Sequence, residues 1–495
     1  MVRSMEMGVT LTRSMSWIGL CQFVSVVLQF GASVVLARYL TPYEMGIYAV
    51  ATAIVGLLAL VQAFGLQSMI VREEHLTPEI ARTAFTINAL GCLALSSGIA
   101  LLSLAGGAML GDDRVRTVML GLAINPWFGI FDFLPAAQLE RSGRFKLLAL
   151  TGIVCGLVAA LVTIGGAMAG ANYMTAVYAG WASAATFGII VNVAGREHVR
   201  FRPSVTEWRR TATFGLQMLA TSGLHSLGGR LSDLCLGKLQ GLGALGIYGR
   251  AGTMNGLIWN NIHLALGRVM FVEFADLHRQ GRSLRNRYIV TVDMVTACLW
   301  PAFAGLAILA GPLIMMIYGD RWVGAAGPMA MLAISSIILV SITMSWEVFT
   351  ATGNLATQTR IEFYNAIFSI LAFAIGCLFS LTAAAASRIV SSVVTVLIFR
   401  PYLSRMTGTT TADLTPIYVR SGVLTAVAVA PAATLMLYYG FAADVPTSPV
   451  LAAVALGMAL WVGALVACRH PLVEEIRKLS FPTVAAPVTA TGDDQ

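Results

Sequence analysis

The stretch Arg38-Tyr-Leu-Thr-Pro-Tyr-Glu-Met-Gly-Ile-Tyr-Ala-Val-Ala51 recurs 200 positions later as Lys238-Leu-Gln-Gly-Leu-Gly-Ala-Leu-Gly-Ile-Tyr-Gly-Arg-Ala251. The two copies align without a gap, and the central Gly-Ile-Tyr is identical at 46–48 and 246–248. Each copy stands between two apolar runs, at the same place in its half of the chain. A match at one fixed offset predicts an internal repeat, so both halves are expected to fold alike.

The sequence around both copies is too apolar for a water-soluble protein. Of the 495 residues, 57% are apolar and 11% are charged, whereas an ordinary soluble domain has about 25% charged residues. The mean hydropathy is +0.78. The composition therefore predicts an all-α polytopic membrane protein, and it excludes a disordered chain or a secreted domain held by disulfides.

Apolar runs separated by polar breaks predict about fourteen transmembrane helices. Six of them lie between the motif copies, so both halves begin on the same side of the membrane. This predicts two pseudo-symmetric six-helix lobes related by an axis along the membrane normal. The expected domains are an N-lobe at 1–211, a C-lobe at 212–410, and two further helices with a tail at 411–495. The predicted spans are 15–37, 47–70, 83–105, 115–137, 147–169, 173–193, 212–236, 246–271, 288–310, 327–352, 362–379, 383–403, 417–440 and 449–468.

The distribution of basic residues supports this count of helices. With loops on alternating sides, the side that holds both termini carries 24 of the 32 lysines and arginines, and the other side carries seven. Such an excess marks the cytoplasmic side, so we expect both termini in the cytoplasm. The seven residues assigned to the outer side are Arg38, Arg114, Arg116, Lys238, Arg250, Arg321 and Arg388.

Polar residues follow one face of the first helix in each half. On the first helix they are spaced at i, i+3, i+7 and i+11, and the offset of 200 carries the pattern onto the seventh helix. Such groups would be unsatisfied against lipid, so a stripe in both halves predicts a shared water-filled cleft. The alternative is that they hydrogen-bond to neighbouring helices. The stripes are Gln22, Ser25, Gln29 and Ser33, and Ser222, His225, Gly229 and Asp233.

Ionisable residues within the predicted spans are the other candidates for function. Arg230 is expected to be the sole basic residue deep in a helix, with Asp233 at i+3 as a possible partner. The two form a structural ion pair, or Arg230 binds a diphosphate, whose oxygens suit a guanidinium fork.

The predicted span 246–271 and two acidic residues give weaker signals. Asn260 and His263 share a face of this span, where they bind sugar hydroxyls or serve in packing. Asp132 and Glu347 lie near cytoplasmic helix ends, so we expect solvated caps or loop contacts there rather than proton relays.

Motifs for catalysis, cofactors or metals do not emerge. Gly241-Leu-Gly-Ala-Leu-Gly246 spells GxGxxG, but a predicted transmembrane helix precedes it where a dinucleotide site needs a strand. The seven cysteines lie in separate apolar runs without a CxxC. We therefore expect no enzyme, no cofactor and no bound metal; the sequence does not choose between Na⁺ and H⁺ as a coupling ion.

A set of short motifs, in this order, resembles the bacterial polysaccharide transporters, the Wzx-like flippases of the MOP superfamily, and most of all the succinoglycan-type exopolysaccharide transport proteins. The resemblance covers about residues 10–405. The motifs are Leu40-Thr-Pro-Tyr-Glu-Met-Gly-Ile-Tyr48, Phe64-Gly-Leu-Gln-Ser followed by Thr83-Ala-Phe, Leu139-Glu-Arg-Ser-Gly-Arg-Phe-Lys146, Arg230-Leu-Ser-Asp-Leu-Cys-Leu-Gly-Lys238 and Tyr318-Gly-Asp-Arg-Trp322.

The resemblance implies a two-lobed transporter of the bacterial inner membrane. Its substrate would be an undecaprenyl-diphosphate-linked oligosaccharide, turned from the inner to the outer leaflet by alternating access for exopolysaccharide or lipopolysaccharide synthesis. The implied partners are this lipid-linked oligosaccharide, membrane lipids, and the polymerase and export machinery, with no nucleic acid.

Two other functions remain open at this point. A multidrug or cation antiporter of the same superfamily would favour buried acids over Arg230. A membrane-embedded glycan polymerase or ligase would need a sizeable outer loop with catalytic residues, and the predicted outer loops are mostly turns.

The charge distribution yields a first testable prediction. Reporter fusions after residues 111, 171 and 444 should lie outside the cytoplasm, and fusions after 205 and 480 should lie inside it. A fusion after residue 205 that reports outside would contradict the fourteen-helix topology.

Overall fold

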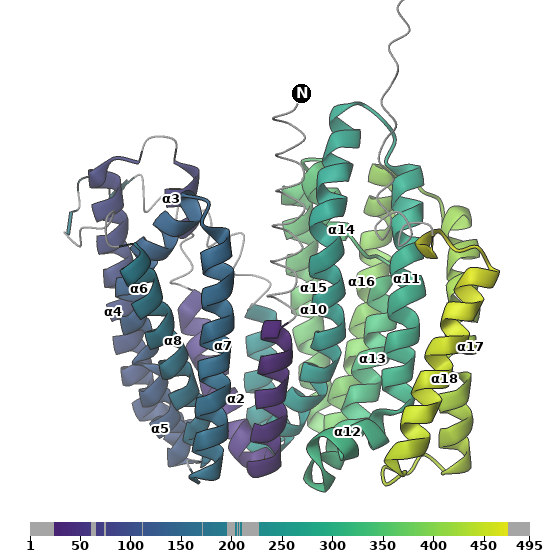
Figure 1. Ribbon diagram of the computed structural model, residues 1–495, viewed down its shortest axis with the longest axis horizontal. Helices are drawn as coiled ribbons and strands as arrows, with labels where there is room; N and C mark the ends of the chain where they lie inside the picture. The colour runs from purple at the N-terminus through teal and green to yellow at the C-terminus, as the bar shows by residue number, and fades with distance from the viewer. Residues whose placement is uncertain are drawn as a thin grey trace, which may run out of the picture. The chain divides into compact units, whose positions relative to one another are not determined.

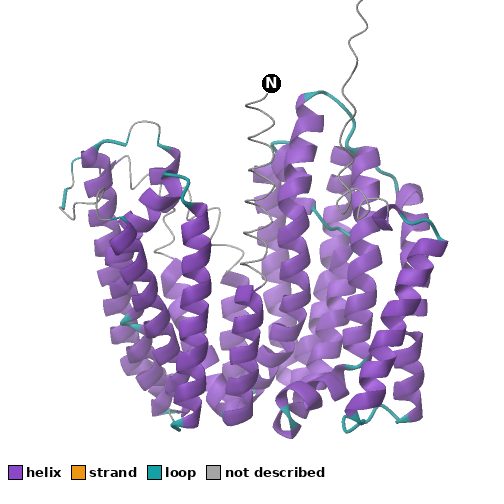
Figure 2. Cartoon of the chain, viewed as in Figure 1, coloured by secondary structure: helices purple, strands orange, loops and turns teal. Residues whose placement is uncertain are grey.

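The computed structural model describes residues 24–60, 66–73, 76–110, 112–170, 172–195, 203–204, 206, 208–209 and 227–473. Within these ranges the regular structure is helical throughout, without a strand (Figure 2). This agrees with the all-α fold predicted from composition.

The described helices overlap the predicted spans, and several of these spans consist of two helices in succession. Two short 3₁₀ helices, η1 (Asn172–Met174) and η2 (Asp320–Ala325), join longer α-helices. Helices without a label in Figure 1 cover Val24–Tyr39 and 227–239. The labelled ones are α2 (Pro42–Leu60), α3 (Leu66–Arg72), α4 (Pro78–Leu110), α5 (Asp113–Leu122), α6 (Asn125–Arg141), α7 (Phe145–Met168), α8 (Thr175–Ala194), α10 (Leu242–Arg279), α11 (Arg285–Ile308), α12 (Ala310–Tyr318), α13 (Ala326–Val340), α14 (Ser345–Ala351), α15 (Leu355–Phe379), α16 (Leu381–Thr407), α17 (Thr411–Tyr438) and α18 (Thr447–Ala467).

In the described residues, eleven helical segments are long and apolar enough to cross a membrane. The protein is therefore a multi-pass membrane protein. The other three predicted spans, 15–37, 212–236 and 246–271, contain residues or side chains that lie outside the described part. The exact number of fourteen stays a prediction.

The chain divides into two compact units, which are described separately. Unit 1 consists of Met1–Leu257, Leu313–Ser335 and Leu355–Thr395. Unit 2 consists of Ile258–Pro312, Ser336–Asn354 and Val396–Gln495. The domain boundaries at 211 and 410 were inferred from the repeat rather than from compactness, and they stay predictions.

Within unit 1 the two motif copies cross each other. A Cβ atom at Gly46 on α2 would overlap with the carbonyl oxygen of Leu242 on α10, and one at Gly246 would overlap with the carbonyl oxygen of Pro42. Positions 42 and 242 differ by the same 200 as the two glycines, so the contact is reciprocal. The repeated glycine thus allows the two repeated helices to touch backbone to backbone.

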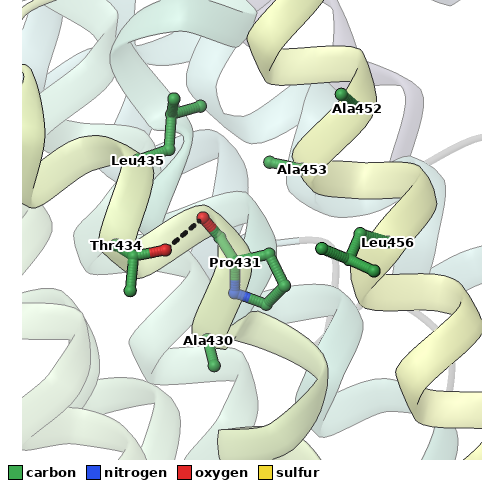
Figure 3. A pocket seen from close by; sticks show the side chains of 7 residues that line it. All are labelled: Ala430, Pro431, Thr434, Leu435, Ala452, Ala453 and Leu456. Atoms are coloured by element: carbon green, nitrogen blue, oxygen red, sulfur yellow. Dashed lines mark hydrogen bonds between the residues drawn. The ribbon is translucent and has the colours of Figure 1, made fainter.

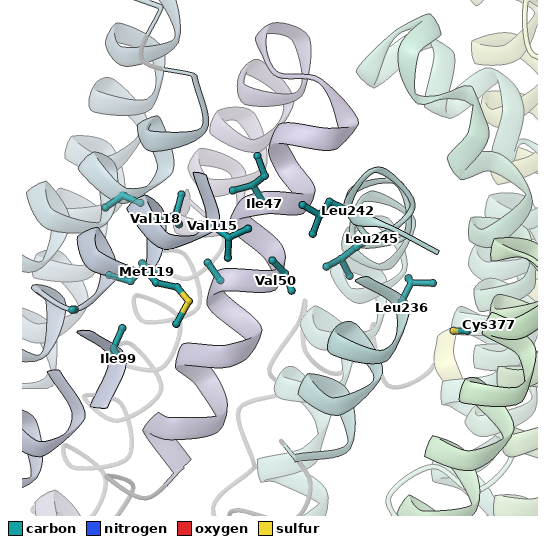
Figure 4. Close-up of a cluster of buried hydrophobic side chains, with 14 of the residues drawn as sticks. Ile47, Val50, Ile99, Val115, Val118, Met119, Leu236, Leu242, Leu245 and Cys377 are labelled. Atoms are coloured by element: carbon teal, nitrogen blue, oxygen red, sulfur yellow. The ribbon is translucent and has the colours of Figure 1, made fainter. Parts of the chain in front are cut away.

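A hydrophobic cluster surrounds this crossing (Figure 4). Ile47 and Val50 of α2 are fully buried in it, beside Leu242 and Leu245 of α10. The cluster also includes Val115, Val118 and Met119 of α5, Ile99 of α4, Leu236 of the helix 227–239 and Cys377 of α15. Burial of this set excludes water around the crossing and holds both helices in register.

The loops next to the motif copies meet at one end of unit 1, which we call the motif end (loops 38–42 and 238–242 with α12 and η2). The Nε atom of Arg38 donates to the carbonyl of Ile317 at 3.0 Å. The indole of Trp322 donates to the carbonyl of Ala37 at 2.8 Å. The Nε2 atom of Gln240 donates to the carbonyl of Cys377 at 2.6 Å. Hydrogen bonds to backbone carbonyls therefore close this end of the unit.

The motif end also contains an ionised cap at the start of α5. Arg114 donates to Asp112 at 2.8 Å, and the hydroxyl of Tyr43 donates to the same carboxylate at 2.9 Å. The hydrogen bond from Arg114 holds the pKa of Asp112 below its usual range. This group links the start of α2 to the start of α5.

In unit 2 the predicted span 327–352 is broken. A turn at 341–344 separates α13 from α14, and Met344 has a φ of 59°. The carbonyl groups around the break are capped by aromatic side chains: Trp300 donates to Ile337 at 3.0 Å and Tyr418 to Ser341 at 2.7 Å. Such capping satisfies backbone groups that a continuous helix would have paired.

Glu347 lies just after this break and is 3% exposed, so the expectation of a solvated cap is wrong. Gly267 of α10 leaves room for it, since a Cβ there would lie 2.7 Å from the Glu347 Oε1 atom.

The two C-terminal helices are fastened to α11 by a buried polar cluster. Arg420 of α17 pairs with Asp293 of α11, and the Nε2 atom of His470 lies 3.2 Å from the other oxygen of that carboxylate. The indole of Trp461 donates to the carbonyl of Ala297 at 2.9 Å. Arg420 was assigned to a cytoplasmic loop, and this is wrong because it lies inside α17 with a buried partner.

The crossing yields a second prediction. Gly46→Ala or Gly246→Ala places a methyl group against a backbone carbonyl and should lower the free energy of unfolding by about 1–3 kcal/mol, as over-packing does. Thermal unfolding in detergent would measure it.

Gly249→Ala is the matched control, because a Cβ at this exposed position of α10 meets no atom within 4 Å. It should keep or slightly raise the unfolding midpoint. Equal midpoints for all three variants would contradict the crossing.

Candidate functional site

Arg230 lies inside unit 1, on the helix 227–239, about 13 Å from the end of that helix at 1.5 Å per residue. Its side chain is half-buried against α2, where a Cβ at Gly56 would lie 2.6 Å from the Arg230 Nε atom. The absence of a side chain at Gly56 therefore leaves the space that this guanidinium occupies. An arginine at this depth is costly in a membrane, which makes it a functional candidate.

A second arginine faces the same region from α16. Arg388 lies about 10 Å from the start of its helix. Its Nη1 atom donates to Ser369 of α15 at 2.8 Å, and its Nε atom donates to Tyr248 of α10 at 3.4 Å. The guanidinium carbon stands 4.2 Å from the centre of the Phe373 ring, a cation–π distance.

Asp233 is an acidic residue on the same helix as Arg230. It lies one turn from Arg230 and is half-buried. The positive charges of Arg230 and Arg388 both act on its carboxylate. Among the ion pairs of the described residues, none joins Arg230 to Asp233. The two side chains are therefore close enough for their charges to interact, but they do not form a salt bridge.

The repeated tyrosines of the motif flank this group. The charge of Arg230 reaches Tyr48 of α2, and the charge of Arg388 reaches Tyr248 of α10. The two tyrosines are equivalent at the offset of 200, so each motif copy brings one hydroxyl beside one arginine. We call these five residues the arginine site: Tyr48, Arg230, Asp233, Tyr248 and Arg388.

Hydroxyl and amide groups continue from the arginine site between α15 and α16. Thr395 donates to Asn365 at 2.8 Å. Ser335 of α13 and Ser392 of α16 share a hydrogen bond of 2.6 Å. These polar side chains hydrogen-bond to one another, and their hydrogen bonds hold the helices together. The guanidinium groups are therefore the charged part of the site.

Arg250 is a third intramembrane arginine, with a different environment. It is 8% exposed and lies about 12 Å from the start of α10. Its Nη1 atom donates to Ser33, and its guanidinium carbon stands 5.7 Å from both the Tyr318 and the Trp322 ring centres. These neighbours enclose Arg250. Its contacts therefore belong to the group of contacts that closes the motif end.

The structure describes three residues of the stripe predicted on the first helix. Ser33 bonds to Arg250, as in the packing alternative. Ser25 is half-buried and has its own polar contact, whereas Gln29 is exposed. On the helix 227–239, Gly229 is exposed as well.

The other predicted site residues are not placed. Gln22, Ser222 and His225 lie outside the described residues. The backbone of Asn260 and His263 belongs to α10, and their side chains lie outside the described part. Their roles stay predictions.

The expectation that Arg230 is the sole basic residue deep in a helix is wrong. Arg250, Arg388 and Arg420 lie within helices as well. Each had been counted with a loop because it falls within a few residues of a predicted helix start. The sequence did contain a signal for them. Each arginine lies three to five residues inside a predicted span, namely 246–271, 383–403 or 417–440.

An apolar groove of about 560 Å³ lies between the two C-terminal helices of unit 2 (Figure 3). The hydroxyl of Thr434 points back to the carbonyl of Pro431 at 2.9 Å, so it is already satisfied. The groove therefore offers nothing to a sugar or phosphate. Its lining residues are Ala430, Pro431, Thr434, Leu435, Ala452, Ala453 and Leu456.

Solved structures share this fold. The chain superposes on "Lipid II flippase MurJ, inward closed conformation" with a TM-score of 0.75, at 14% identity, over 92% of this chain and 99% of that one. It superposes on the inward-facing conformation of a multidrug resistance MATE family transporter of the MOP superfamily with a TM-score of 0.60, at 14% identity, over 78% and 96%. The chain therefore shares the fold of these two solved structures.

Sequence comparison narrows the class to a family. Residues 35–327 match the model of the polysaccharide biosynthesis protein family, and the chain belongs to this family. It is 22% identical to the succinoglycan biosynthesis transport protein ExoT of Rhizobium meliloti (strain 1021), over 67% of each chain. It is 21% identical to the lipopolysaccharide biosynthesis protein WzxC of Escherichia coli (strain K12), over 62% of this chain and 63% of that one.

The placement of the exposed positions yields a third prediction. In a background without native cysteines, cysteines at Gln29 and Gly229 should react with a small water-soluble thiol reagent, because both positions are exposed and share the predicted polar face. Val27, an exposed apolar residue about 160° around the helix, should stay unreactive because it faces lipid. Equal labelling at all three positions would contradict a water-filled cleft.

Proposed function

We propose that this protein is a flippase that moves an undecaprenyl-diphosphate-linked oligosaccharide repeat unit across the bacterial inner membrane for exopolysaccharide or lipopolysaccharide synthesis. The observation that carries the proposal is the arginine site. Two half-buried guanidinium groups stand in the membrane-spanning part of unit 1, and among the described residues Asp233 is the one carboxylate near them. A diphosphate is the anionic part of such a substrate, and guanidinium groups bind phosphate oxygens in a bidentate manner.

The barrier to unaided flipping is the loss of water around the charged and sugar-bearing headgroup. In the proposed mechanism, the arginine site replaces the water around the diphosphate. The lipid tail stays in the bilayer. In this way only the headgroup passes through the protein.

The closure of the motif end supports alternating access. The predicted topology puts this end outside, where the crossing at Gly46 and the bonds of Arg38 and Trp322 close it. In the proposed cycle the substrate enters the arginine site from the cytoplasmic leaflet. The motif-end contacts then open so that the headgroup leaves on the outer side.

The surroundings of the protein follow from the same proposal. Both termini lie in the cytoplasm, and the partners are the lipid-linked oligosaccharide, membrane lipids, the polysaccharide polymerase and the export machinery. The protein acts as a transporter rather than an enzyme, without a cofactor of its own. A multidrug antiporter is the alternative; a binding site for cationic drugs would need uncompensated acids, whereas the arginine site has more positive than negative groups.

Substitution of the two arginines yields a fourth prediction. Arg230→Ala and Arg388→Ala should each lower polysaccharide export about tenfold or more, since hydrogen bonds to charged groups contribute about 1.5–3 kcal/mol. The Lys variants should lose less export activity, because lysine keeps the positive charge but cannot form the bidentate hydrogen bonds of a guanidinium group. Export and the amount of folded protein are measured together.

Arg279→Ala is the control. Arg279 is an exposed arginine of α10, paired only with Asp276 one turn away, and its loss should leave export unchanged. Normal export from Arg230→Ala at normal protein levels would remove Arg230 from the substrate site. Loss of folded protein in both Arg230→Ala and Asp233→Asn would indicate a structural ion pair. Unaltered polysaccharide but changed drug resistance in a deletion strain would favour the antiporter.

A further inference from the structure

A polar stripe runs along one face of α15. Its members are spaced at i, i+4, i+7 and i+11, so they lie within about 60° of one another around the helix axis. All are buried or half-buried, whereas Ile367 and Leu371 on the opposite face are exposed. The stripe is therefore turned toward protein rather than lipid. It consists of Gln358, Glu362, Asn365 and Ser369.

One end of this stripe belongs to the arginine site, because Ser369 accepts a hydrogen bond from Arg388 at 2.8 Å. Glu362 lies seven residues earlier on α15, about 10 Å along the helix axis, and both residues belong to unit 1. The contacts of the motif end close the other side of the arginine site. The sugars of a substrate bound there would therefore extend along the stripe, toward the start of α15.

The stripe contains hydrogen-bonding groups that the protein does not use. Gln358 is 3% exposed, and its Nε2 atom donates to the Oε1 atom of Glu362 at 2.8 Å. The Oε1 atom of Gln358 is buried and has no hydrogen-bond partner in the described part of the chain. Asn365 accepts a bond from Thr395 at 2.8 Å through its Oδ1 atom, which leaves its amide donors free among the described residues. A buried amide oxygen without a donor is costly, which indicates that a ligand supplies one.

Glu362 also carries a charge that lacks a counter-ion. Among the ion pairs of the described residues, none includes this carboxylate. It is half-buried, about 10 Å inside a helix that is long and apolar enough to cross a membrane. An acidic residue is expensive in such a segment, and its position is therefore a functional candidate.

Sugar hydroxyls fit the groups of the stripe. A hydroxyl both donates and accepts, so hydroxyls can serve the free acceptors of Gln358 and Glu362 and the free donors of Asn365. A sugar carboxylate would instead lie beside the carboxylate of Glu362, and like charges placed together weaken binding. The stripe therefore favours a neutral, hydroxyl-rich sugar over an acidic one.

We propose that Gln358, Glu362 and Asn365 bind the second sugar of the lipid-linked oligosaccharide and select a neutral sugar over a uronic acid at that position. The proposal rests on the proposed function and adds the sugar specificity of the same substrate path. The first sugar is bonded to the diphosphate itself, so the distance of about 10 Å along α15 places the next sugar beside Glu362.

Binding of two matched probes to the purified full-length protein tests the selection. Each probe is farnesyl diphosphate esterified to a disaccharide, whose second sugar is glucose in one probe and glucuronic acid in the other. Calorimetry at pH 7, where the uronic acid is ionised, gives both affinities. The native protein should bind the glucose probe at least about tenfold more tightly, because the glucuronate meets a like charge.

Two variants assign the selection to Glu362. Glu362→Gln keeps the size of the side chain and removes its charge, so the ratio of the two affinities should fall to about twofold or less. A merely structural role of Glu362 would change both affinities alike and keep their ratio. Glu79→Gln is the matched control, since Glu79 is an exposed residue in the first turn of α4, and it should keep the native ratio.

The outcomes separate this proposal from the proposed function. Equal affinities for both probes, or tighter binding of the glucuronate probe, overturn the sugar selection and leave the flippase proposal intact. A native ratio that persists in Glu362→Gln overturns the assignment to this residue. No binding of either probe overturns the proposed function and this proposal with it, and binding of tetraphenylphosphonium in their place would favour the antiporter. Should Glu362→Gln fail to fold, the ratio in the native protein still decides whether a neutral sugar is selected.

Discussion

The backbone contact of α2 and α10 at Gly46 and Gly246 is the constraint on which the rest of unit 1 depends. Neither helix could approach the other if either position carried a side chain, because each Cβ would overlap with a carbonyl of the partner. The same approach fixes the axial position of both helices. It therefore places Tyr48 near Arg230 and Tyr248 near Arg388, two residues beyond the repeated glycines, and it brings Gly56 against Arg230.

Arg230, Arg250 and Arg388 of unit 1 each lie about 10–13 Å from a helix end, yet their surroundings assign them different roles. Arg250 is enclosed by Ser33 and two aromatic rings, and its charge is committed to the closed motif end. The guanidinium group of Arg388 makes a cation–π contact with Phe373 and donates a hydrogen bond to Ser369. Arg230 packs against a glycine. The charge available to a ligand therefore increases from Arg250 to Arg388 and Arg230, which places the proposed substrate contact between the last two.

Sequence reasoning predicted the helical fold and the family resemblance because these depend on composition, period and local motifs. The repeat found at 46–48 and 246–248 marked the crossing itself, since a glycine repeated at a fixed offset keeps its geometric role. Arg230 and Asp233 were identified because they stand well inside an apolar run. Arg388 was missed because it lies near a predicted helix start, and only the packing of α16 against α15 and α10 shows that it faces inward.

Other errors have the same cause. The break at 341–344 has no glycine or proline within it, and it is stabilised by Tyr418 and Trp300 from helices distant in sequence. Asp293 and Arg420 are 127 residues apart, so their pairing could not be inferred from helical spacing. Local patterns thus predicted where helices run, while the partners of buried polar groups depended on tertiary packing.

Translocation by the purified protein in liposomes tests the central claim most directly. A fluorescent undecaprenyl-diphosphate oligosaccharide is placed in both leaflets, and a reagent that cannot cross the membrane quenches the outer one. We predict that the native protein makes the inner pool accessible, and that a protein with Arg230→Ala and Arg388→Ala together, folded and reconstituted in equal amount, does not. Equal accessibility with the native and the doubly substituted protein would contradict the account.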